Sequence, residues 1–482
     1  MFVRRCRASR ASAASFAAHG AGVALAVAAL AACSGLPVIN PDLALERSKP
    51  VQIEGVRGPL TTAQSKALLA RLQKNGEDTS IFERHLALEQ SIVDSPLTSG
   101  NKVVLLQNGP DTYSAMFAAI ERARDNIHVE SYIIEDGEVG NRFADALIAK
   151  QLAGVPVSLI YDSVGSLATA KAFFQRLIDA GIKVVEFNPI NPLTAKAGWQ
   201  VNHRDHRKLM IVDGRIAFLG GINISSVYSS GSFGRRASPA ANAAKAKDGA
   251  AAPWRDTDLQ VQGPVVAEFQ KLFLATWAMQ KGDVLDAQSS FPALTSQGDE
   301  VVRAIGSSPD QEQSQTLMYQ TLMSAINSAE SSVNLTNAYF VPDAQLLVAL
   351  KAAAARGAEV QMILPGNTDS WLVYNIGRSH YGELLKGGVK IYQRRGALLH
   401  AKTAVIDGVW STVGSTNLDW RSFLHNDEVN AVILGQGFAG QMQAMFAADL
   451  AASDPVTLEA WQRRPLLDRM REMVAWIWEY WL

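Results

Sequence analysis

Two stretches of the chain decide its fold: His206-Arg207-Lys208-Leu209-Met210-Ile211-Val212-Asp213 and His400-Ala401-Lys402-Thr403-Ala404-Val405-Ile406-Asp407. Both have the pattern His-x-Lys-x4-Asp, and equivalent positions are 194 residues apart. A glycine and an asparagine follow each stretch at matching separations: Gly220 and Asn223 after the first, Gly414 and Asn417 after the second. One such motif can arise by chance, but two copies in the same register indicate an internal repeat.

The sequence around the two motifs also repeats. Apolar periodicity and the glycines between segments predict alternating strands and helices in both halves. In the first half, strands are expected at 102–107, 127–134 and 155–161, with helices at 112–124 and 139–153. In the second half, a helix at 316–330, a strand at 332–341, a helix at 344–355 and a strand at 358–364 follow in the same order. This alternation predicts an α/β fold with a central sheet in each half.

The spacing within each motif places a histidine beside a lysine. The four residues after each lysine are apolar or β-branched, which predicts a buried strand, and residues i and i+2 of a strand share a face. A neutral imidazole can attack phosphorus, while Lys208 and Lys402 can neutralise the oxygens of an anionic phosphodiester. Asn223 and Asn417 follow glycine turns and are expected to donate amide hydrogens to the same oxygens.

The motif pair resembles that of the phospholipase D superfamily, and the resemblance covers most of residues 100–450. It implies two homologous α/β/α sandwich domains, here expected at 99–285 and 286–455, with the active site at their pseudo-two-fold interface. It also implies covalent catalysis without a metal or other cofactor. One histidine forms a phosphohistidine, and the other protonates the leaving alcohol and then activates the incoming one. By analogy His206 is the nucleophile and His400 the acid/base, although the symmetry of the motifs allows the reverse.

The resemblance also assigns roles to carboxylates. Asp213 and Asp407, the last residues of the two motifs, are implied to be structural and buried beneath the motif. A carboxylate after each motif is implied to orient a histidine through its other ring nitrogen: Asp256 in the first half, with Asp258 as a weaker candidate, and Glu428 in the second. Ordinary surface charge is the alternative interpretation of these three residues. The full motif set is His206, Lys208, Asp213, His400, Lys402 and Asp407.

Within the superfamily, residues 202–223, 254–263 and 414–422 resemble bacterial cardiolipin synthases. Those enzymes join two phosphatidylglycerols and release glycerol, so the expected activity is that of a phosphatidyltransferase with phosphatidylglycerol as its substrate. Three alternatives stay open: a phospholipase D that hydrolyses phospholipids to phosphatidic acid, a periplasmic phosphodiesterase or nuclease, and a lipid-binding lipoprotein with inactive motifs.

The N-terminus predicts export and a lipid anchor. Four arginines precede an apolar stretch at 21–32, and Leu30-Ala31-Ala32-Cys33 resembles a bacterial lipobox. Residues 1–33 are therefore expected to be a lipoprotein signal, with cleavage before Cys33 and acylation of its sulfur; an uncleaved transmembrane anchor is the alternative. Residues 34–98 are expected to form a linker with helices at 63–73 and 80–92. The expected product is a bacterial membrane-anchored lipoprotein that faces the periplasm.

Composition narrows the possible partners and sites. Cys6 and Cys33 are the only cysteines, so a chain that begins at Cys33 has neither a disulfide nor a thiolate metal site. Loss of residues 1–32, whose only charges are four arginines, changes the net charge from −1 to −5, which argues against a nucleic-acid partner. The polar stretch 229–252 is expected to be a surface excursion or a lid. The tail at 456–482, rich in Trp and Tyr, is expected either at a membrane interface or packed on the domain.

Overall fold

The structure, a computed structural model, describes residue 36 and residues 53–72, 95–191, 200, 202–229, 252–309 and 316–479. The chain divides into a unit Met1–Pro37 and a unit Val38–Leu482, and the description below concerns the second unit. Several expectations lie outside the described residues and stay predictions: the signal with Cys33, the helix at 80–92, residues 230–251 of the polar stretch, and the final Tyr480 and Trp481.

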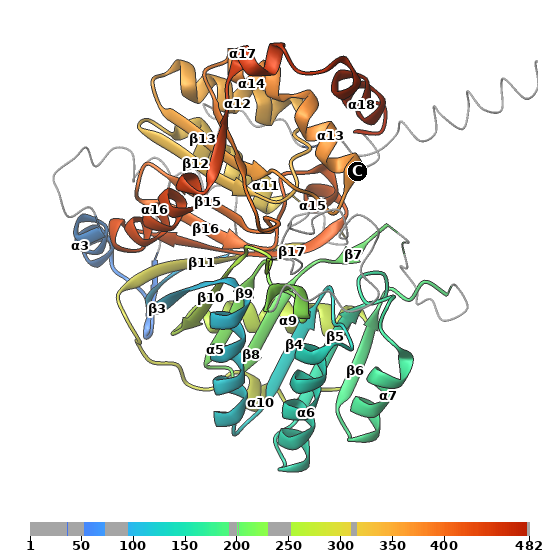
Figure 1. Cartoon of the computed structure of the whole chain (residues 1–482). Helices are drawn as coiled ribbons and strands as arrows, with labels where there is room; N and C mark the ends of the chain where they lie inside the picture. The colour runs from blue at the N-terminus through green and yellow to red at the C-terminus, as the bar shows by residue number, and fades with distance from the viewer. Residues whose placement is uncertain are drawn as a thin grey trace, which may run out of the picture. The chain divides into compact units, whose positions relative to one another are not determined.

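The first half contains a mixed sheet with the strand order β6-β5-β4-β8-β9-β10-β3. These strands are β6 (Lys183–Phe187), β5 (Val157–Asp162), β4 (Ile127–Ser131), β8 (Lys208–Val212), β9 (Ile216–Gly220), β10 (Thr257–Gln262) and β3 (Leu97–Gln107). The first three run parallel to one another, and the other neighbours pair antiparallel. The accompanying helices are α5 (Asn108–Arg122), α6 (Glu138–Leu152), α7 (Lys171–Asp179) and α9 (Val266–Met279) (Figure 1).

The second half repeats this arrangement in the order β14-β13-β12-β15-β16-β17-β11. These strands are β14 (Lys390–Arg394), β13 (Glu359–Pro365), β12 (Ser332–Asn337), β15 (Lys402–Ile406), β16 (Trp410–Gly414), β17 (Asn426–Leu434) and β11 (Glu300–Ser307). An edge strand, β18 (Ser453–Val456), pairs with β14. The helices are α11 (Leu317–Ser328), α12 (Ala344–Ala355), α13 (Trp371–Ser379), α14 (Tyr381–Lys386) and α16 (Gln436–Ala451). The matching strand orders confirm the predicted fold class of two homologous α/β halves.

The two sheets meet edge to edge, where β3 pairs antiparallel with β11. Both faces of β8 are buried: Leu209 and Ile211 lie in a core with residues of α9, whereas Met210 and Val212 lie in a core with residues of α5 and α6. A strand covered on both faces needs an unbroken apolar run, which explains the sequence after Lys208. The core around Leu209 also contains residues of β16 and α16, so the two halves share it.

Shorter elements complete the described chain: β1 (Ile53–Gly55), β2 (Gly58–Pro59), α3 (Thr62–Leu72), β7 (Arg204–Asp205), η2 (Ser226–Tyr228), α10 (Ala287–Ser290), α15 (Trp420–Leu424), α17 (Leu458–Gln462) and α18 (Leu466–Trp476). The helices α3 and α12 agree with those expected at 63–73 and 344–355. Two expected strands end early, at Ser131 and Asn337, because the chain there leaves the sheet and places Tyr132 and Tyr339 against the motif histidines. The domain boundaries, including that between 285 and 286, stay predictions.

Candidate active site

The backbone of each half holds the histidine of the other half. β7 ends one residue before His206 and pairs in parallel with the start of β17. As a result, the amide of His206 donates a hydrogen bond to the carbonyl of Asp427 at 2.9 Å. On the other side, the amide of His400 donates to the carbonyl of Arg255 at 2.8 Å. Asp427 directly precedes Glu428, and Arg255 directly precedes Asp256. Each predicted orienting carboxylate therefore lies next to the histidine of the opposite half.

The side chains complete this crossed arrangement. Nδ1 of His206 lies 3.0 and 3.1 Å from the two carboxylate oxygens of Glu428, which belongs to the second half. Nδ1 of His400 lies 2.7 Å from Oδ2 of Asp256, which belongs to the first. All four side chains are buried. The structure therefore brings the predicted carboxylates to the histidines, and it adds that each one serves the motif of the opposite half.

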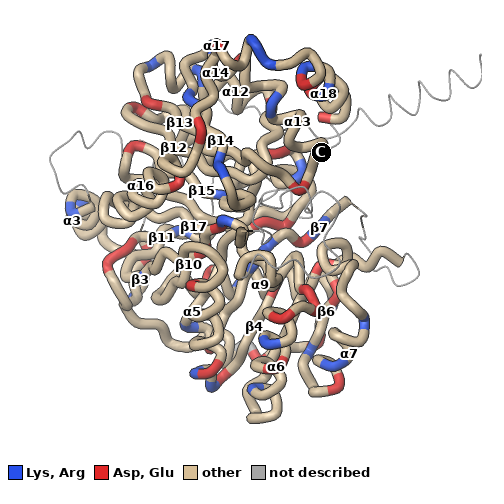
Figure 2. Tube along the Cα trace, in the orientation of Figure 1, with Lys and Arg blue, Asp and Glu red and all other residues tan. Residues whose placement is uncertain are grey.

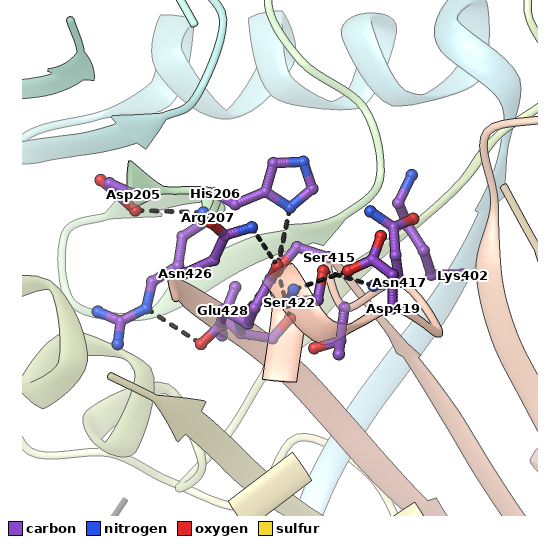
Figure 3. Close-up of polar contacts among 12 residues, drawn as sticks. Asp205, His206, Arg207, Lys402, Ser415, Asn417, Asp419, Ser422, Asn426 and Glu428 are labelled. Atoms are coloured by element: carbon purple, nitrogen blue, oxygen red, sulfur yellow. Dashed lines mark hydrogen bonds and ion pairs between the residues drawn. The ribbon is translucent and has the colours of Figure 1, made fainter. Parts of the chain in front are cut away.

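The two carboxylates have different surroundings. Glu428 accepts hydrogen bonds from Oγ of Ser415 at 2.5 Å and Nδ2 of Asn426 at 3.2 Å, and Figure 3 shows both side chains directed at it beside His206. The position equivalent to Ser415 in the first half is Gly221, where an added Cβ would lie only 2.1 Å from Oδ1 of Asp256. A glycine is therefore required for Asp256 to reach His400, whereas Glu428 has space for a serine.

The motif lysines lie at the starts of β8 and β15, buried beside the histidines. Nζ of Lys208 donates to the carbonyl of His206 at 2.5 Å. Nζ of Lys402 donates to the carbonyl of His400 and lies 3.0 Å from Nδ1 of the same residue. Burial lowers the pKa of Lys208 to about 7 and that of Lys402 to about 8, despite the nearby carboxylates. An anion placed between these lysines would restore their full charge.

The carboxylates and histidines of the site also have shifted pKa values, and the two carboxylates differ in how far they are ionised. Burial raises the pKa of Glu428 to about 7, although Lys208 acts to lower it. Burial also acts to raise the pKa of Asp256, but His400 and Lys402 outweigh it and hold that pKa below its usual value. Burial, with the motif lysines, lowers the pKa of both histidines. At neutral pH the carboxylate of Asp256 is therefore ionised, whereas that of Glu428 is only partly ionised.

Aromatic rings surround both histidines. Tyr132 contacts His206 edge to face, with ring centroids 4.9 Å apart. His400 is surrounded by Tyr228, Trp254 and Tyr339, with centroid separations of 5.9, 5.4 and 6.1 Å, respectively. None of these aromatic residues was predicted from the sequence as part of the site. For Tyr132 and Tyr339 the available signal is position, since each comes soon after a strand that pairs with a motif strand.

The two motif asparagines are placed differently from each other. Nδ2 of Asn223 donates to the hydroxyl of Tyr228 at 3.0 Å, and its Oδ1 accepts from the amide of Ile133 at 3.1 Å. One of its two amide hydrogens is therefore used within the protein. Asn417 is buried, and its Oδ1 has no hydrogen-bond partner among the described residues. Figure 3 places its side chain beside that of Lys402. Donation by either asparagine to a substrate stays a prediction.

The motif aspartates do not lie at the histidines. Asp213 and Asp407 are partly buried at the far ends of β8 and β15, where they adopt positive φ angles of 54° and 52°. Asp213 accepts hydrogen bonds from the amides of 124, 125 and 126, and Asp407 from the amides of 330, 331 and 332. They therefore anchor the turns before β4 and β12. Asp258 has a different partner from Asp256, since its Oδ1 accepts a hydrogen bond from the amide of Ile222.

Buried ion pairs lie on both sides, but they come from different positions: Arg207 directly follows His206, whereas on the His400 side Arg255 pairs with Asp449. Arg207 donates through Nη1 to Thr276 at 2.7 Å, lies 3.4 Å from Glu130, and donates through Nε to the carbonyl of Glu428 at 3.1 Å. The equivalent residue on the other side is Ala401. Residues of both charge signs accordingly meet around β7 and β17, between the two halves (Figure 2).

Comparison with known proteins agrees with this geometry. Residues 116–230 and 322–450 match the family model described as "Cardiolipin synthase, PLD-like domain". The chain is 35% identical over 393 residues to a cardiolipin synthase of Geobacillus sp. (strain WCH70), which covers 81% of this chain and 74% of that protein. It is 34% identical over 384 residues to a cardiolipin synthase of Listeria monocytogenes serovar 1/2a, which covers 79% of this chain and 75% of that protein.

A solved structure supports the fold. The phosphatidylserine synthase of Haemophilus influenzae Rd KW20 superposes with a TM-score of 0.60 at 12% sequence identity, over 82% of this chain and 96% of that one. At this identity the likeness concerns the arrangement of the two halves and their sheets. Along the described residues, no helix combines the length and the apolar character needed to cross a bilayer.

Proposed function

Because the chain belongs to the cardiolipin synthase family of phospholipase-D-like proteins, we propose that it is a phosphatidyltransferase that joins two phosphatidylglycerols and releases glycerol. The observation that carries the proposal is the buried pair of histidines, each hydrogen-bonded to a carboxylate from the opposite half and each beside a lysine. The family relationship supports transfer to an alcohol over the alternatives of hydrolysis and nuclease activity.

The first step would form a phosphohistidine. Nε2 of His206 attacks the phosphorus of one phosphatidylglycerol, and the bond between phosphorus and the glycerol oxygen breaks. His400 donates a proton to that oxygen, so glycerol leaves uncharged. Lys208 and Lys402 balance the charge on the non-bridging oxygens, which otherwise repels the nucleophile.

The second step would reverse these roles on a new alcohol. A hydroxyl of the second phosphatidylglycerol gives its proton to His400, and its oxygen attacks the same phosphorus. The bond between phosphorus and Nε2 of His206 breaks, which releases cardiolipin and restores both histidines. Equal numbers of protons enter and leave, so the cycle needs no other reactant.

The surroundings of the histidines support this division of roles. An acid/base must carry a positive charge for part of the cycle, and the ionised Asp256 at 2.7 Å stabilises that form of His400. A nucleophile must stay neutral, and Glu428, whose pKa is about 7, places less negative charge on His206. Substrate phosphate would offset the lysine charges that lower the pKa of His400.

The proposal is tested by lipid analysis of purified protein incubated with phosphatidylglycerol vesicles, together with His206→Ala and His400→Ala. Cardiolipin and glycerol in equal amounts are expected, with both products lost in both variants. Phosphatidic acid in place of cardiolipin would make the protein a hydrolase. No lipid turnover would overturn the proposal and direct attention to other phosphodiesters.

We also propose that the protein is held at the outer face of a bacterial inner membrane or the inner face of an outer membrane through an acyl chain on Cys33. The support is the lipobox and the apolar stretch before it. Labelling cells with a radioactive fatty acid should mark the wild-type protein and leave Cys33→Ala unlabelled. If the wild-type protein and Cys33→Ala are both labelled, the acyl chain is attached to another residue and the proposed anchor at Cys33 is wrong.

A further inference from the structure

The helix α18 presents an apolar face to solvent. The exposed apolar side chains of α18 and of the two residues after it, here called the α18 stripe, are between 48% and 72% exposed: Leu466, Leu467, Met470, Met473, Val474, Trp476, Ile477 and Trp478. The spacing of 466, 470, 473 and 477 places them in one line along a helix, and 467, 474 and 478 lie in the neighbouring line. Side chains of this size in a continuous row form an unusual surface for a protein that meets only water.

A charged side chain of α18, Glu472, faces the protein, while the large apolar side chains face outward. Glu472 is buried and accepts hydrogen bonds from Arg378 of α13 at 3.3 Å and from Arg464 at 2.7 Å. Glu479, just after the helix, lies 3.0 Å from Nε2 of His380. A surface helix usually docks through its large apolar side chains, whereas here ionic contacts and the small Ala475 hold the helix and the large apolar residues point outward.

Two arginines accompany the α18 stripe. At about 100° per residue, Arg471 falls at one margin of the apolar arc, and Arg469 falls near the other margin, between Met473 and Trp476. Both side chains are exposed. Arginine stems lie well along acyl chains while the guanidinium groups reach lipid phosphates, and tryptophan favours the boundary between headgroups and hydrocarbon. An outward apolar face with arginine margins is the pattern of a helix that lies in a membrane interface.

The α18 stripe is close to the proposed site. Ala475 on the inner side of α18 packs against Ile376 of α13, and α18 lies beside α13 in Figure 1. α13 begins two residues after Asp369, whose Oδ2 accepts a 2.6 Å hydrogen bond from the hydroxyl of Tyr339. Tyr339 in turn contacts the ring of His400. One helix therefore separates the stripe from the residues around a motif histidine.

We propose that the α18 stripe docks on a lipid bilayer and brings the site beside His400 to the phospholipids of that bilayer. The choice of a bilayer as the occupant rests on the proposed function, in which both substrates are membrane lipids. An acyl chain on Cys33 would only tether the protein, whereas the stripe would fix which side of it faces the membrane. Because four arginines and four acidic residues balance between 457 and 479, apolar insertion is expected to dominate over salt-sensitive attraction.

The contact can be measured independently of catalysis. In the full chain with Cys6→Ala and Cys33→Ala, an environment-sensitive fluorophore is attached through Met473→Cys or, as a control on another exposed residue, through Val284→Cys. With phosphatidylglycerol–phosphatidylcholine vesicles, the Met473→Cys label should shift to shorter wavelength and be quenched by brominated lipids. The Val284→Cys label should do neither. A silent Met473→Cys label, or an equal response from both, overturns the proposal. A response to protein concentration without vesicles assigns the stripe to a second copy of the chain.

Catalysis supplies a second test with matched variants. One variant carries Met470→Ser, Met473→Ser and Ile477→Ser; its control carries Leu152→Ser, Val284→Ser and Val348→Ser, which are also exposed apolar residues. The first should lose about tenfold or more of its turnover on vesicles and keep its turnover on dissolved short-chain phosphatidylglycerol. The control should keep both, and equal behaviour of the two variants on vesicles contradicts docking. If even the wild-type protein makes no cardiolipin, the proposed function fails while the fluorescence still decides whether α18 docks.

Discussion

The two carboxylates that contact the motif histidines differ in length and in their immediate neighbours. Asp256 is paired with His400 and lies against Gly221, whereas Glu428 accepts from Ser415 and is paired with His206. Equal roles would favour equal surroundings, since the two backbones repeat each other closely. At the scale of single residues, the site therefore has one side suited to a charged imidazolium and one suited to a neutral imidazole.

Removal of charge from the two carboxylates should have unequal effects. Asp256→Asn is expected to lower kcat on the order of 10³-fold, because His400 then loses the anion that stabilises its protonated form. Glu428→Gln is expected to cost on the order of 10-fold to 10²-fold, since Glu428 is only partly ionised at pH 7. Initial rates of cardiolipin formation at pH 7 provide the comparison. A larger loss for Glu428→Gln would reverse the assignment of the histidines.

The lysines predict a basic limb in the pH profile. A lysine is charged below its pKa, so the free enzyme loses phosphate-binding charge as the pH rises through about 7 for Lys208 and about 8 for Lys402. The value of kcat/KM should fall across this range. Bound phosphate keeps both lysines protonated, so kcat should fall only at higher pH. Coincident limbs in the two profiles, near the ordinary pKa of lysine, would contradict this explanation.

At the scale of elements, β8 and β15 have different functions at their two ends. Each strand begins with a motif lysine and is followed by a motif aspartate at a positive φ angle. A strand of five residues spans roughly 16 Å, so that aspartate is far from the reacting atoms. The motif thus combines one end at the proposed active site with one anchoring end, which explains why its last residue is separated from the lysine by four buried positions.

Asp213→Ala and Asp407→Ala should therefore reduce stability more than chemistry. Each leaves three backbone amides without their acceptor and places alanine in a left-handed conformation, at a cost of about 2 kcal/mol or more. Chemical unfolding should show a lower midpoint for both variants, with kcat of the folded protein within a few-fold of wild type. Asp299→Ala removes an exposed aspartate and serves as the control. A loss of kcat comparable to that of His206→Ala would show that these aspartates take part in catalysis.

Much of the element pattern was predictable from the sequence. Strands covered on both faces have continuous apolar runs, and the two halves confirm each other through the constant separation of 194 residues. The ends of strands were less predictable, as at Ser131 and Asn337, because apolar and aromatic residues continue past the last ladder bond. At these two points the backbone conformation depends on contacts with a histidine from a distant segment, and such contacts cannot be predicted from the local sequence.

At the scale of the whole molecule, both crossed contacts are made within one chain. A mixture of His206→Ala and His400→Ala proteins should consequently recover no activity, because neither chain contains both histidines and no exchange of halves is needed to complete the site. Cardiolipin formation by the mixture, measured after refolding together and after simple mixing, checks this. Recovery of a fraction of wild-type activity after simple mixing would mean that chains exchange halves at equilibrium.

The crossing itself could not be read from the sequence. Motif spacing singled out the histidines, lysines and carboxylates that the structure brings together, since each belongs to a repeated local pattern. Which carboxylate meets which histidine depends on the pairing of β7 with β17 and on the bridge between Arg255 and Leu399, both of which are contacts between halves. An internal repeat predicts the structure of each half, but it does not predict the contacts between the two halves.

The differences between equivalent positions have a genetic consequence. In a symmetric assembly of two identical chains, every substitution is made twice, so both sides of a shared site change together. Here the two sides are encoded by separate codons, and equivalent pairs have diverged, among them Arg207 and Ala401, Gly221 and Ser415, and Asp256 and Glu428. Because both halves belong to one chain, each histidine can be tuned for a separate task, whereas in a homodimer with the same contacts both histidines would change together.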